Sequence, residues 1–376
     1  MRPQMEVADV FRTHGPSYRE THKLPLNQLR TMHAVEICRT EDLGGHVDEC
    51  EECGHVKISY NSCRNRHCPK CQFLKKEKWI EARGKDLLPI QYFHVVFTLP
   101  DGLNPLALRN REVIYNILFK AASETLTELA QTRFGARIGF IAVLHTWGQN
   151  LLDHPHLHCV VSGGGLSQGK WISSKRRFLF PVKVMSRLFR GKFLSFLRKA
   201  YEADTLEFAG IAHLGEAFAA FLSQLYAKEW VVYAKPPFNG PETVLAYLGR
   251  YTHRIAITNH RIAGMKDGKV SFSWKDYADG NTQKIMTLDA AEFIRRFLLH
   301  VLPDGFVKIR HFGLLGNRNR KACLETCRML LGVKEPEPAS SETWQESLLR
   351  ITGIDVTLCP LCHGQMRRKE LYRGPP

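Results

Sequence analysis

Apolar residues along the middle of the chain follow patterns that are typical of strands and helices. The stretch QYFHVVFTLP (91–100) predicts a buried strand that ends at a proline. The segments IGFIAVLHTW (138–147) and HPHLHCVVSG (154–163) predict two further strands, joined as a hairpin. Apolar residues recur at helical spacing over 112–134. These elements predict a domain that contains both helices and an antiparallel hairpin.

The second half of the chain shows the same two kinds of pattern. Residues 241–257 and 290–303 have helical spacing, and FVKIRHFGLL (306–315) predicts a strand. The stretch GVKEPEPASSE (332–342) has the composition of a linker. We therefore expect an amino-terminal domain over 1–88, a main domain over 89–331, and a linker with a short tail over 332–376.

Composition narrows the class of protein. The chain has 376 residues, 44% of them hydrophobic, which predicts a globular fold rather than disorder. Its formal net charge of +16 favours a polyanionic partner, either nucleic acid or an anionic surface. No apolar run reaches the length of a membrane span, and MRPQMEVADVF lacks the apolar core of a signal peptide. We expect a cytoplasmic, nucleoid-associated protein with no membrane partner.

Cysteines are concentrated near the amino terminus. Cys50 and Cys53 form one C-x-x-C pair, and Cys68 and Cys71 form a second. Two such turns can supply the four thiolates of a tetrahedral zinc site. A closed four-thiolate site has no open position for a reactant, so we expect this zinc ribbon to be structural.

Other candidate metal ligands lie in the same segment and at the carboxyl end. A second zinc site is an open alternative to packed or exposed side chains for Cys38, His46, Cys63 and His67. In the tail, Cys359 and Cys362 could share a zinc ion with Cys323 and Cys327, with His363 as a further ligand.

Basic residues follow the cysteines. Between 64 and 85 the chain carries eight lysines and arginines against Glu77 and Glu81. Such a run is usually a solvated face, but beside a zinc module it favours contact with DNA. Arg64, Arg66 and Lys70 are the candidate contacts within this run.

Histidines alternate along the predicted strand 154–163. A hairpin loop centred near 150–151 places His145 opposite His156, with His158 on the same face two residues along. Three imidazoles on one patch of a sheet suit a catalytic divalent metal better than a closed structural site. Half-exposed strand histidines are the plain alternative, with His154 as a loop residue and Gln149 as a competing third ligand.

Two tyrosines lie one helical turn apart in the predicted helix 241–257. Tyr247 and Tyr251 sit at the edge of its apolar stripe, so their hydroxyl groups could reach a neighbouring surface. A tyrosine oxygen can attack a phosphodiester and form a phosphotyrosine link. Arg250 and Arg254 nearby could bind phosphates. Without further context, such a pair is more often part of a packed boundary.

Together these motifs resemble a known superfamily. The triplet His156-Leu157-His158 resembles the His-hydrophobic-His motif of HUH single-strand endonucleases, and Tyr247-Leu-Gly-Arg-Tyr251 resembles the paired nucleophiles of their two-tyrosine branch. The segment YNSCRNRHCPKCQ (60–72) is similar to the zinc-binding segment of rolling-circle transposases of the insertion sequence 91 type.

The resemblance implies a fold and a reaction. The fold class would be α+β, an antiparallel sheet with flanking helices of the HUH type, plus a small amino-terminal zinc ribbon. Mg²⁺ or Mn²⁺ held by the three histidines would polarise the scissile phosphate of single-stranded DNA at the element ends. Tyr247 and Tyr251 would be the nucleophiles, and each would retain a 5′-phosphate. Zn²⁺ would be structural.

Two other function classes stay open. A replication initiator or relaxase-type nickase would use the same chemistry, although the zinc ribbon and paired tyrosines argue against it. A non-enzymatic, zinc-dependent DNA-binding regulator would leave the histidine strand unexplained.

Overall fold

The computed structural model describes residues 5–174, 179–235, 243, 244, 247, 249, 256–277, 279–334 and 342–372. The chain divides into two compact units. Unit 1 comprises residues 1–79, 253–301 and 337–376, and unit 2 comprises 80–252 and 302–336. Helix α3 (Gln72–Gly84) contains the boundary at residues 79 and 80.

Unit 2 is built around an antiparallel sheet in the order β11-β4-β5-β3-β7, with β6 paired to β5. Its strands are β3 (Tyr92–Thr98), β4 (Arg137–Trp147), β5 (Asp153–Ser167), β6 (Lys170–Ser173), β7 (Val232–Lys235) and β11 (Ile309–Gly313). Its helices are α4 (Asn104–Arg109), α5 (Arg111–Phe134), α6 (Val182–Glu202), α7 (Ala212–Glu216), α8 (Phe218–Ala227) and α11 (Arg320–Leu331), with a 3₁₀ turn at Asp101–Leu103. The predicted α+β class with antiparallel strands is confirmed.

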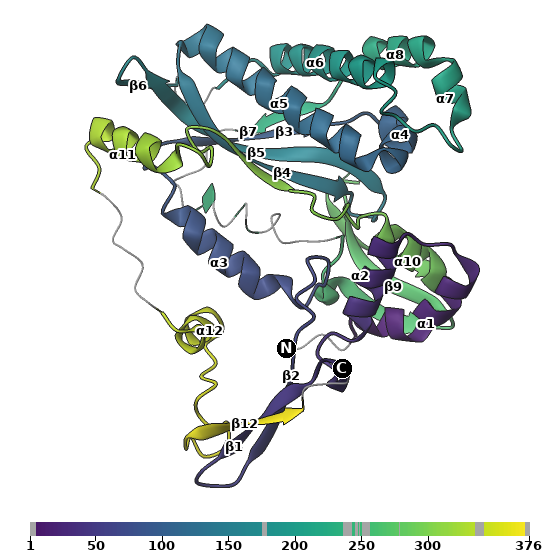
Figure 1. The fold of residues 1–376 in the computed structure, drawn as a ribbon, viewed down its shortest axis with the longest axis vertical. Helices are drawn as coiled ribbons and strands as arrows, with labels where there is room; N and C mark the ends of the chain where they lie inside the picture. Colours follow the sequence, from purple (N-terminus) through teal and green to yellow (C-terminus); the bar gives the residue numbers. More distant parts are fainter. Residues whose placement is uncertain are drawn as a thin grey trace. The chain divides into compact units, whose positions relative to one another are not determined.

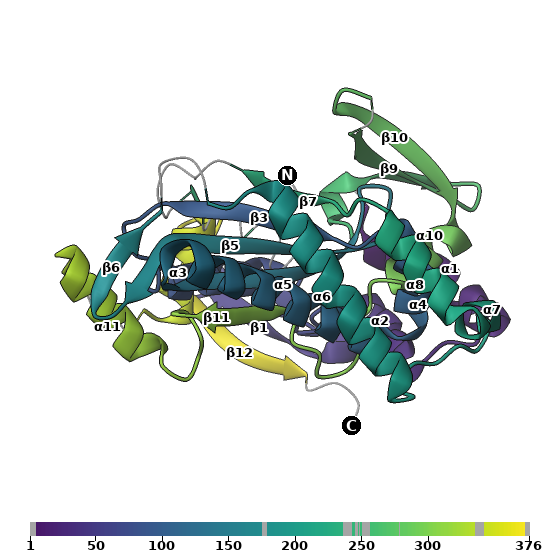
Figure 2. The same cartoon turned by 90° about the horizontal axis from the view of Figure 1, so that it is seen from above.

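One face of this sheet is apolar and is covered by helices. Figure 1 shows α5 and α6 side by side over the sheet, and Figure 2 shows α6 running obliquely to its strands. The side chains that the strands send toward these helices form one buried cluster; they include Phe93, Val95, Phe97, Phe140, Ala142, Leu157, Cys159 and Val161. Since successive residues of a strand point to opposite faces, the residues between them lie on the other face. Those residues include the histidines.

The predicted hairpin of β4 and β5 is confirmed, including its register. His145 pairs with His156, and Val143 pairs with His158. On the other side of β5, Thr98 pairs with His156 and Val96 with His158. Strand β5 therefore lies in the middle of the sheet, and its histidines are flanked by strands on both sides.

Three consecutive glycines, Gly163 to Gly165, continue β5 rather than forming a turn. A Cβ atom on Gly164 would lie 2.6 Å from the carbonyl oxygen of Ile172 in β6, and one on Gly165 would lie 2.5 Å from that of Arg137 in β4. The glycines are required because neighbouring backbone comes this close.

Unit 1 contains two small sheets. The first has the order β10-β9-β8 and the second has the order β12-β1-β2. The strands are β1 (Gly45–Cys50), β2 (Val56–Tyr60), β8 (Ile262–Lys266), β9 (Lys269–Asp276), β10 (Thr282–Asp289) and β12 (Met366–Tyr372). The helices are α1 (Val7–Thr21), α2 (Leu26–Glu36), α10 (Ala290–Leu298) and α12 (Trp344–Thr352), with 3₁₀ turns at Glu41–Leu43 and Asn259–Arg261.

The compact units differ from the three expected domains. Residues 253–301 fall in unit 1, although we expected them within the main domain over 89–331. The reason is packing between helices α1 and α10, where the rings of Phe11 and Phe297 meet edge to face at 5.2 Å. The tail also belongs to unit 1, because β12 pairs with β1 (Figure 1). None of the described helices combines the length and apolarity needed to span a bilayer.

Candidate functional site

Three imidazole rings converge on the face of the unit 2 sheet opposite α5 and α6. His145 comes from β4, and His156 and His158 come from β5. One ring nitrogen of each lies within 4.8 Å of the others. The Nε2 atoms of His156 and His158 are 3.1 Å apart. Two ligands at right angles on one ion, each about 2.1 Å from it, would be separated by about 3 Å.

The hydrogen bonds of these rings leave nitrogen atoms available for a metal. The Nδ1 atom of His156 lies 2.6 Å from the carbonyl oxygen of His154, which can only accept. Nδ1 therefore carries the proton, and the lone pair of Nε2 is exposed to the cluster. A backbone carbonyl behind a ligating histidine is a common way of fixing its tautomer. His154 contributes this carbonyl and is not a member of the cluster.

Burial keeps the rings of His156 and His158 neutral. Burial, together with the charge of His154, lowers the pKa of His156 to about 3. The pKa of His158 also falls well below its usual value, first through burial and then through His145 and His156. Neutral imidazole is the form that binds metal ions. The three residues therefore have the spacing and orientation of a three-nitrogen metal site, and His156 and His158 also have its protonation state.

A fourth histidine, His94, adjoins the cluster and was missed by the sequence analysis. It lies on β3 opposite Val160, so it faces the same side as the three others. Its Nε2 atom is 2.9 Å from Nδ1 of His158. Burial, with a smaller contribution from Lys235, lowers its pKa to about 4. The available signal was a histidine inside the otherwise apolar strand FHVVF.

Tyr247 reaches the same cluster through His94. Its backbone is helical, and its hydroxyl oxygen lies 3.3 Å from Nδ1 and 3.4 Å from Nε2 of His94. The two rings meet at 62° with centroids 4.7 Å apart. Tyr251, Arg250 and Arg254 lie outside the described residues, so their roles stay predictions.

The cysteines form two four-sulfur clusters in unit 1, and both differ from the predicted grouping. Cys68 and Cys71 meet Cys38 and Cys63, whereas Cys50 and Cys53 meet Cys359 and Cys362. The prediction of one site from Cys50, Cys53, Cys68 and Cys71 is therefore wrong as a set. The reason is strand pairing: Cys50 ends β1 opposite Met366 of β12, which brings the tail cysteines beside it.

The spacing within each cluster fits zinc. Sulfur pairs are separated by 3.5 Å (Cys38 and Cys71) and 3.6 Å (Cys63 and Cys71) in the first cluster. In the second cluster, Cys50 and Cys362 are 3.4 Å apart. A tetrahedral site with Zn–S bonds of about 2.3 Å separates its sulfurs by about 3.8 Å. No cysteine among those described forms a disulfide.

The remaining predicted ligands lie outside these clusters. Nε2 of His46 lies 3.6 Å from a carboxylate oxygen of Asp48, and His67 is buried without joining the sulfurs. Cys323 belongs to neither cluster, and its sulfur accepts a hydrogen bond from Arg137. Cys327 and His363 are also absent from both clusters.

The predicted basic contacts in the zinc segment have different surroundings. Arg64 is exposed and has a left-handed backbone with φ of 53°; its carbonyl accepts a hydrogen bond from Lys75. Lys70 forms an ion pair with Glu6, and Arg66 is half-buried. Arg64 is therefore the most accessible of the three.

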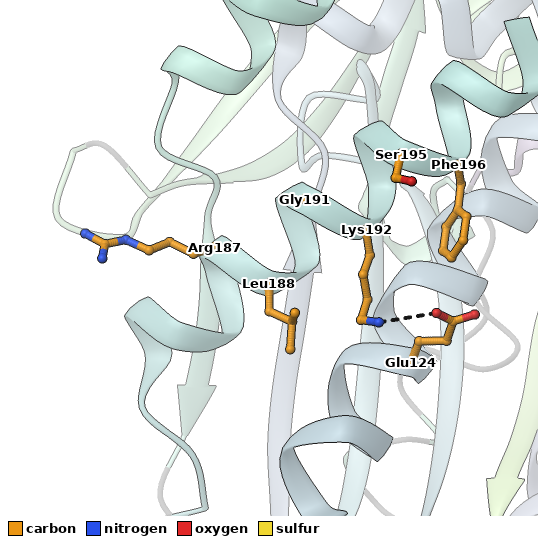
Figure 3. A pocket seen from close by; sticks show the side chains of 7 residues that line it. All are labelled: Glu124, Arg187, Leu188, Gly191, Lys192, Ser195 and Phe196. Atoms are coloured by element: carbon orange, nitrogen blue, oxygen red, sulfur yellow. Dashed lines mark hydrogen bonds and ion pairs between the residues drawn. The ribbon is translucent and has the colours of Figure 1, made fainter. Parts of the chain in front are cut away.

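A shallow groove lies on the outer side of α5 and α6. Figure 3 shows Lys192 of α6 reaching toward Glu124 of α5 beside the ring of Phe196. The nitrogen of Lys192 lies 2.9 Å from Glu128 and 3.4 Å from Glu124. This groove contains none of the predicted site residues, and it lies on the helical side of the sheet.

Comparisons with known proteins find similarity to transposases. The family model for a putative transposase matches residues 139–322, and that for a transposase zinc-binding domain matches residues 10–99. The putative transposase y4qJ of Sinorhizobium fredii is 52% identical over 99% of this chain and 97% of its own length. The transposase for insertion sequence element IS801 of Pseudomonas savastanoi pv. phaseolicola is 29% identical over 90% of this chain and 82% of its own length. No solved structure matches the chain.

Proposed function

Because this chain belongs to the family of insertion sequence 91 transposases with an amino-terminal zinc-binding domain, we propose that it nicks and rejoins single-stranded DNA through a 5′-phosphotyrosine intermediate. Such a reaction would support rolling-circle transposition. The observation that carries the proposal is the convergence of three imidazoles on one face of the sheet, beside a tyrosine that contacts their neighbour His94.

The three histidines fit a divalent metal such as Mg²⁺ or Mn²⁺. His156 is held with its Nε2 lone pair toward the cluster, and the 3.1 Å spacing to His158 matches two ligands of one ion. When bound, the ion would polarise the scissile phosphate and offset the charge that develops there. Three protein ligands would leave positions open for the phosphate.

Tyr247 is the proposed nucleophile. Its oxygen would form a bond to phosphorus as the bond to the 3′ oxygen breaks, so the tyrosine retains the 5′-phosphate. The phenol loses its proton, and the departing 3′ oxygen gains one to become a hydroxyl. The link conserves the energy of the phosphodiester, which allows a later 3′-hydroxyl to reverse the step. Tyr251, four positions on, would allow a second strand to be cleaved while the first link persists.

His94 is a positioning residue in this scheme. If Nε2 of His158 ligates the metal, Nδ1 carries the proton and donates it to Nε2 of His94. Nδ1 of His94 then carries its own proton and faces the Tyr247 oxygen at 3.3 Å. A donor in this position would orient the hydroxyl group and stabilise the oxygen as it loses its proton.

The net positive charge of the chain and its membership of a transposase family both support DNA as the partner. Arg250 and Arg254, beside the tyrosines, would bind phosphates near the scissile bond, and Arg64, Arg66 and Lys70 would bind DNA from the zinc segment. The net charge of +16 supports such contacts. The substrate would be the single-stranded ends of the element, and the protein would act on nucleoid DNA in the bacterial cytoplasm.

A covalent adduct on a denaturing gel tests the proposal. Purified protein would be incubated with labelled single-stranded DNA carrying the element ends, in Mn²⁺ or in EDTA. We expect an adduct on the 5′ side of the nick that needs Mn²⁺ and is lost in the double variant Tyr247→Phe, Tyr251→Phe. Tyr226→Phe, which changes an exposed tyrosine of α8, is the matched control.

The same gel separates the alternatives. No adduct despite tight binding to the element ends would favour a non-enzymatic DNA-binding regulator. Equal adduct formation on unrelated plasmid origins would favour a replication initiator or relaxase-type nickase.

A further inference from the structure

Two cysteine pairs at opposite ends of the chain form the same local structure in unit 1. In the first, the backbone N–H of Cys50 donates to the carbonyl of His55, and that of Gly54 donates to the carbonyl of Cys50. In the second, Cys359 donates to Gly364, and His363 donates to Cys359. The lengths agree closely, at 2.9 and 3.1 Å in the first turn and 2.8 and 3.0 Å in the second.

Backbone angles repeat as well. The residue directly after the second cysteine of each pair has a left-handed conformation, with φ of 69° at Gly54 and 63° at His363. Glycine adopts this conformation without strain, whereas histidine does so at a cost. The structure maintains the turn at His363 even though the residue type does not favour it. If both turns must direct their two sulfur atoms at one ion, both need this left-handed residue after the second cysteine.

Backbone N–H groups point at the tail sulfurs. The N–H of Leu361 lies 3.4 Å from the sulfur of Cys359, and the N–H of Gly364 lies 3.4 Å from that of Cys362. Such donors favour a thiolate over a thiol.

The two turns are packed directly against each other. The sulfurs of Cys53 and Cys359 are 3.7 Å apart, although 306 positions separate the residues in sequence. A Cβ atom on Gly364 would lie 2.5 Å from the side chain of Glu52 in the first turn, so the two turns approach each other closely. The adjoining strands continue the contact, since Arg368 of β12 donates to the buried carboxylate of Asp48 at 2.9 Å.

We propose that Cys50, Cys53, Cys359 and Cys362 bind a second structural Zn²⁺ that joins the carboxy-terminal tail to the amino-terminal zinc-binding domain. Four sulfurs close the coordination shell, so this ion has no open position for a reactant. Neither matched family region, 10–99 or 139–322, includes the tail pair. The tail is thus an integral part of the zinc-binding domain, which holds two zinc ions.

A stabilising ion is needed here because the sheet has little core. Val56 and Ile58 of β2 are more than half exposed, and the strand alternates between exposed and half-buried positions. Three short strands with so little buried apolar surface are marginal without a metal or cross-link. Zinc bound by four thiolates contributes its binding energy to folding.

Zinc content of the full-length protein, measured by mass spectrometry of the metal, tests the proposal. The double variant Cys359→Ser, Cys362→Ser is expected to lose one zinc per chain relative to the parent. The double variant Cys50→Ser, Cys53→Ser is expected to lose that same zinc ion. Combining all four changes should remove no more than either pair. Cys323→Ser with Cys327→Ser, in α11, is the matched control and should retain the parental content.

Two further measurements distinguish the loss of a zinc ligand from a general failure of a variant to fold. Cys362→His supplies a different zinc ligand at the same position and should restore the ion that Cys362→Ser loses. Trypsin should cleave after Arg367, Arg368 or Lys369 faster in Cys50→Ser with Cys53→Ser than in the parent. This test counts metal and does not depend on DNA cleavage, so its outcome is separate from that of the proposed function.

Three outcomes would overturn the proposal. The first is unchanged zinc content in the tail variant. The second is a parent that lacks four free thiols under denaturing titration, because the two pairs would then be joined by two disulfides. The third is tryptic cleavage of the tail that is unaffected by changes at Cys50 and Cys53.

Discussion

His94 on β3 and His158 on β5 lie with their facing ring nitrogens 2.9 Å apart and their rings nearly parallel at 10°. This contact joins the proposed nucleophile to the proposed metal site, because His94 contacts Tyr247 on one side and a cluster member on the other. It also supplies a prediction that can be tested without DNA.

His94→Leu is expected to weaken Mn²⁺ binding by about 10- to 100-fold, since it removes the group that holds His158 in its ligating tautomer. Calorimetric titration with Mn²⁺ measures this directly. His94→Gln retains a side-chain acceptor and should recover part of the affinity. His213→Ala, which changes an exposed histidine of α7, is the control. Equal affinity in His94→Leu and the parent would remove the positioning role.

A substitution of Cys68 tests whether the cluster of Cys38, Cys63, Cys68 and Cys71 binds zinc. This residue is buried in contact with the other three cysteines, so Cys68→Ser should lose one zinc per chain and lower the melting temperature. Thermal unfolding followed by circular dichroism, with metal analysis of the same sample, measures both. Cys159→Ala, in the apolar core of unit 2, is expected to lower stability while the zinc content stays unchanged. Loss of stability without loss of zinc in Cys68→Ser would contradict a ligand role.

The buried carboxyl group of Asp153 is expected to make the stability of the folded protein depend on pH. Neither of its carboxylate oxygens has a hydrogen-bond partner within the described structure. Burial, partly offset by Arg111, raises the pKa of Asp153 from 3.8 to about 7. Because the folded state holds the proton more tightly, this stabilising contribution is complete below about pH 4 and is lost as pH rises through about 7.

Asp153→Asn should therefore raise the free energy of unfolding at pH 8 by roughly 2–4 kcal/mol, and should change it little at pH 4. Urea denaturation at the two pH values provides the comparison. An equal effect at both would show that ionisation of Asp153 is not the cause.

Replacing a glycine by alanine is expected to have opposite effects on stability in β5 and in α6. Gly165→Ala places a Cβ atom against the backbone of Arg137 and should destabilise the protein by about 1–3 kcal/mol. Gly191→Ala lies on the outer side of α6, where a Cβ atom meets nothing within 4 Å (Figure 3). It should stabilise the protein by about 0.5–1 kcal/mol, because alanine loses less backbone entropy in a helix. Denaturant unfolding measures the change in the free energy of unfolding for each variant. Changes of the same sign in the two variants would contradict the prediction.

Local patterns were sufficient for the hairpin of β4 and β5 and for three of the histidines. The alternation of apolar residues and the short loop near 150 predicted both strands of the hairpin and the pairing of His145 with His156. In an antiparallel pair the register follows from the loop, so neighbouring residues carry this information. The family was likewise predictable, since its motifs are short and their order is specific.

Long-range pairing was not predictable in the same way. A C-x-x-C turn supplies half of a tetrahedral site, and nothing within the turn specifies which other pair completes it. The pairing of β12 with β1 brought Cys359 to Cys53, and His94 came beside His158 because β3 lies on the other side of β5. The amino-acid sequence alone thus predicted the hairpin of β4 and β5, strands β3 and β11, helices α5 and α10, most of the residue types at the sites, and the family. Tertiary structure decided which distant residues share a site, because that depends on contacts between segments that no local pattern relates.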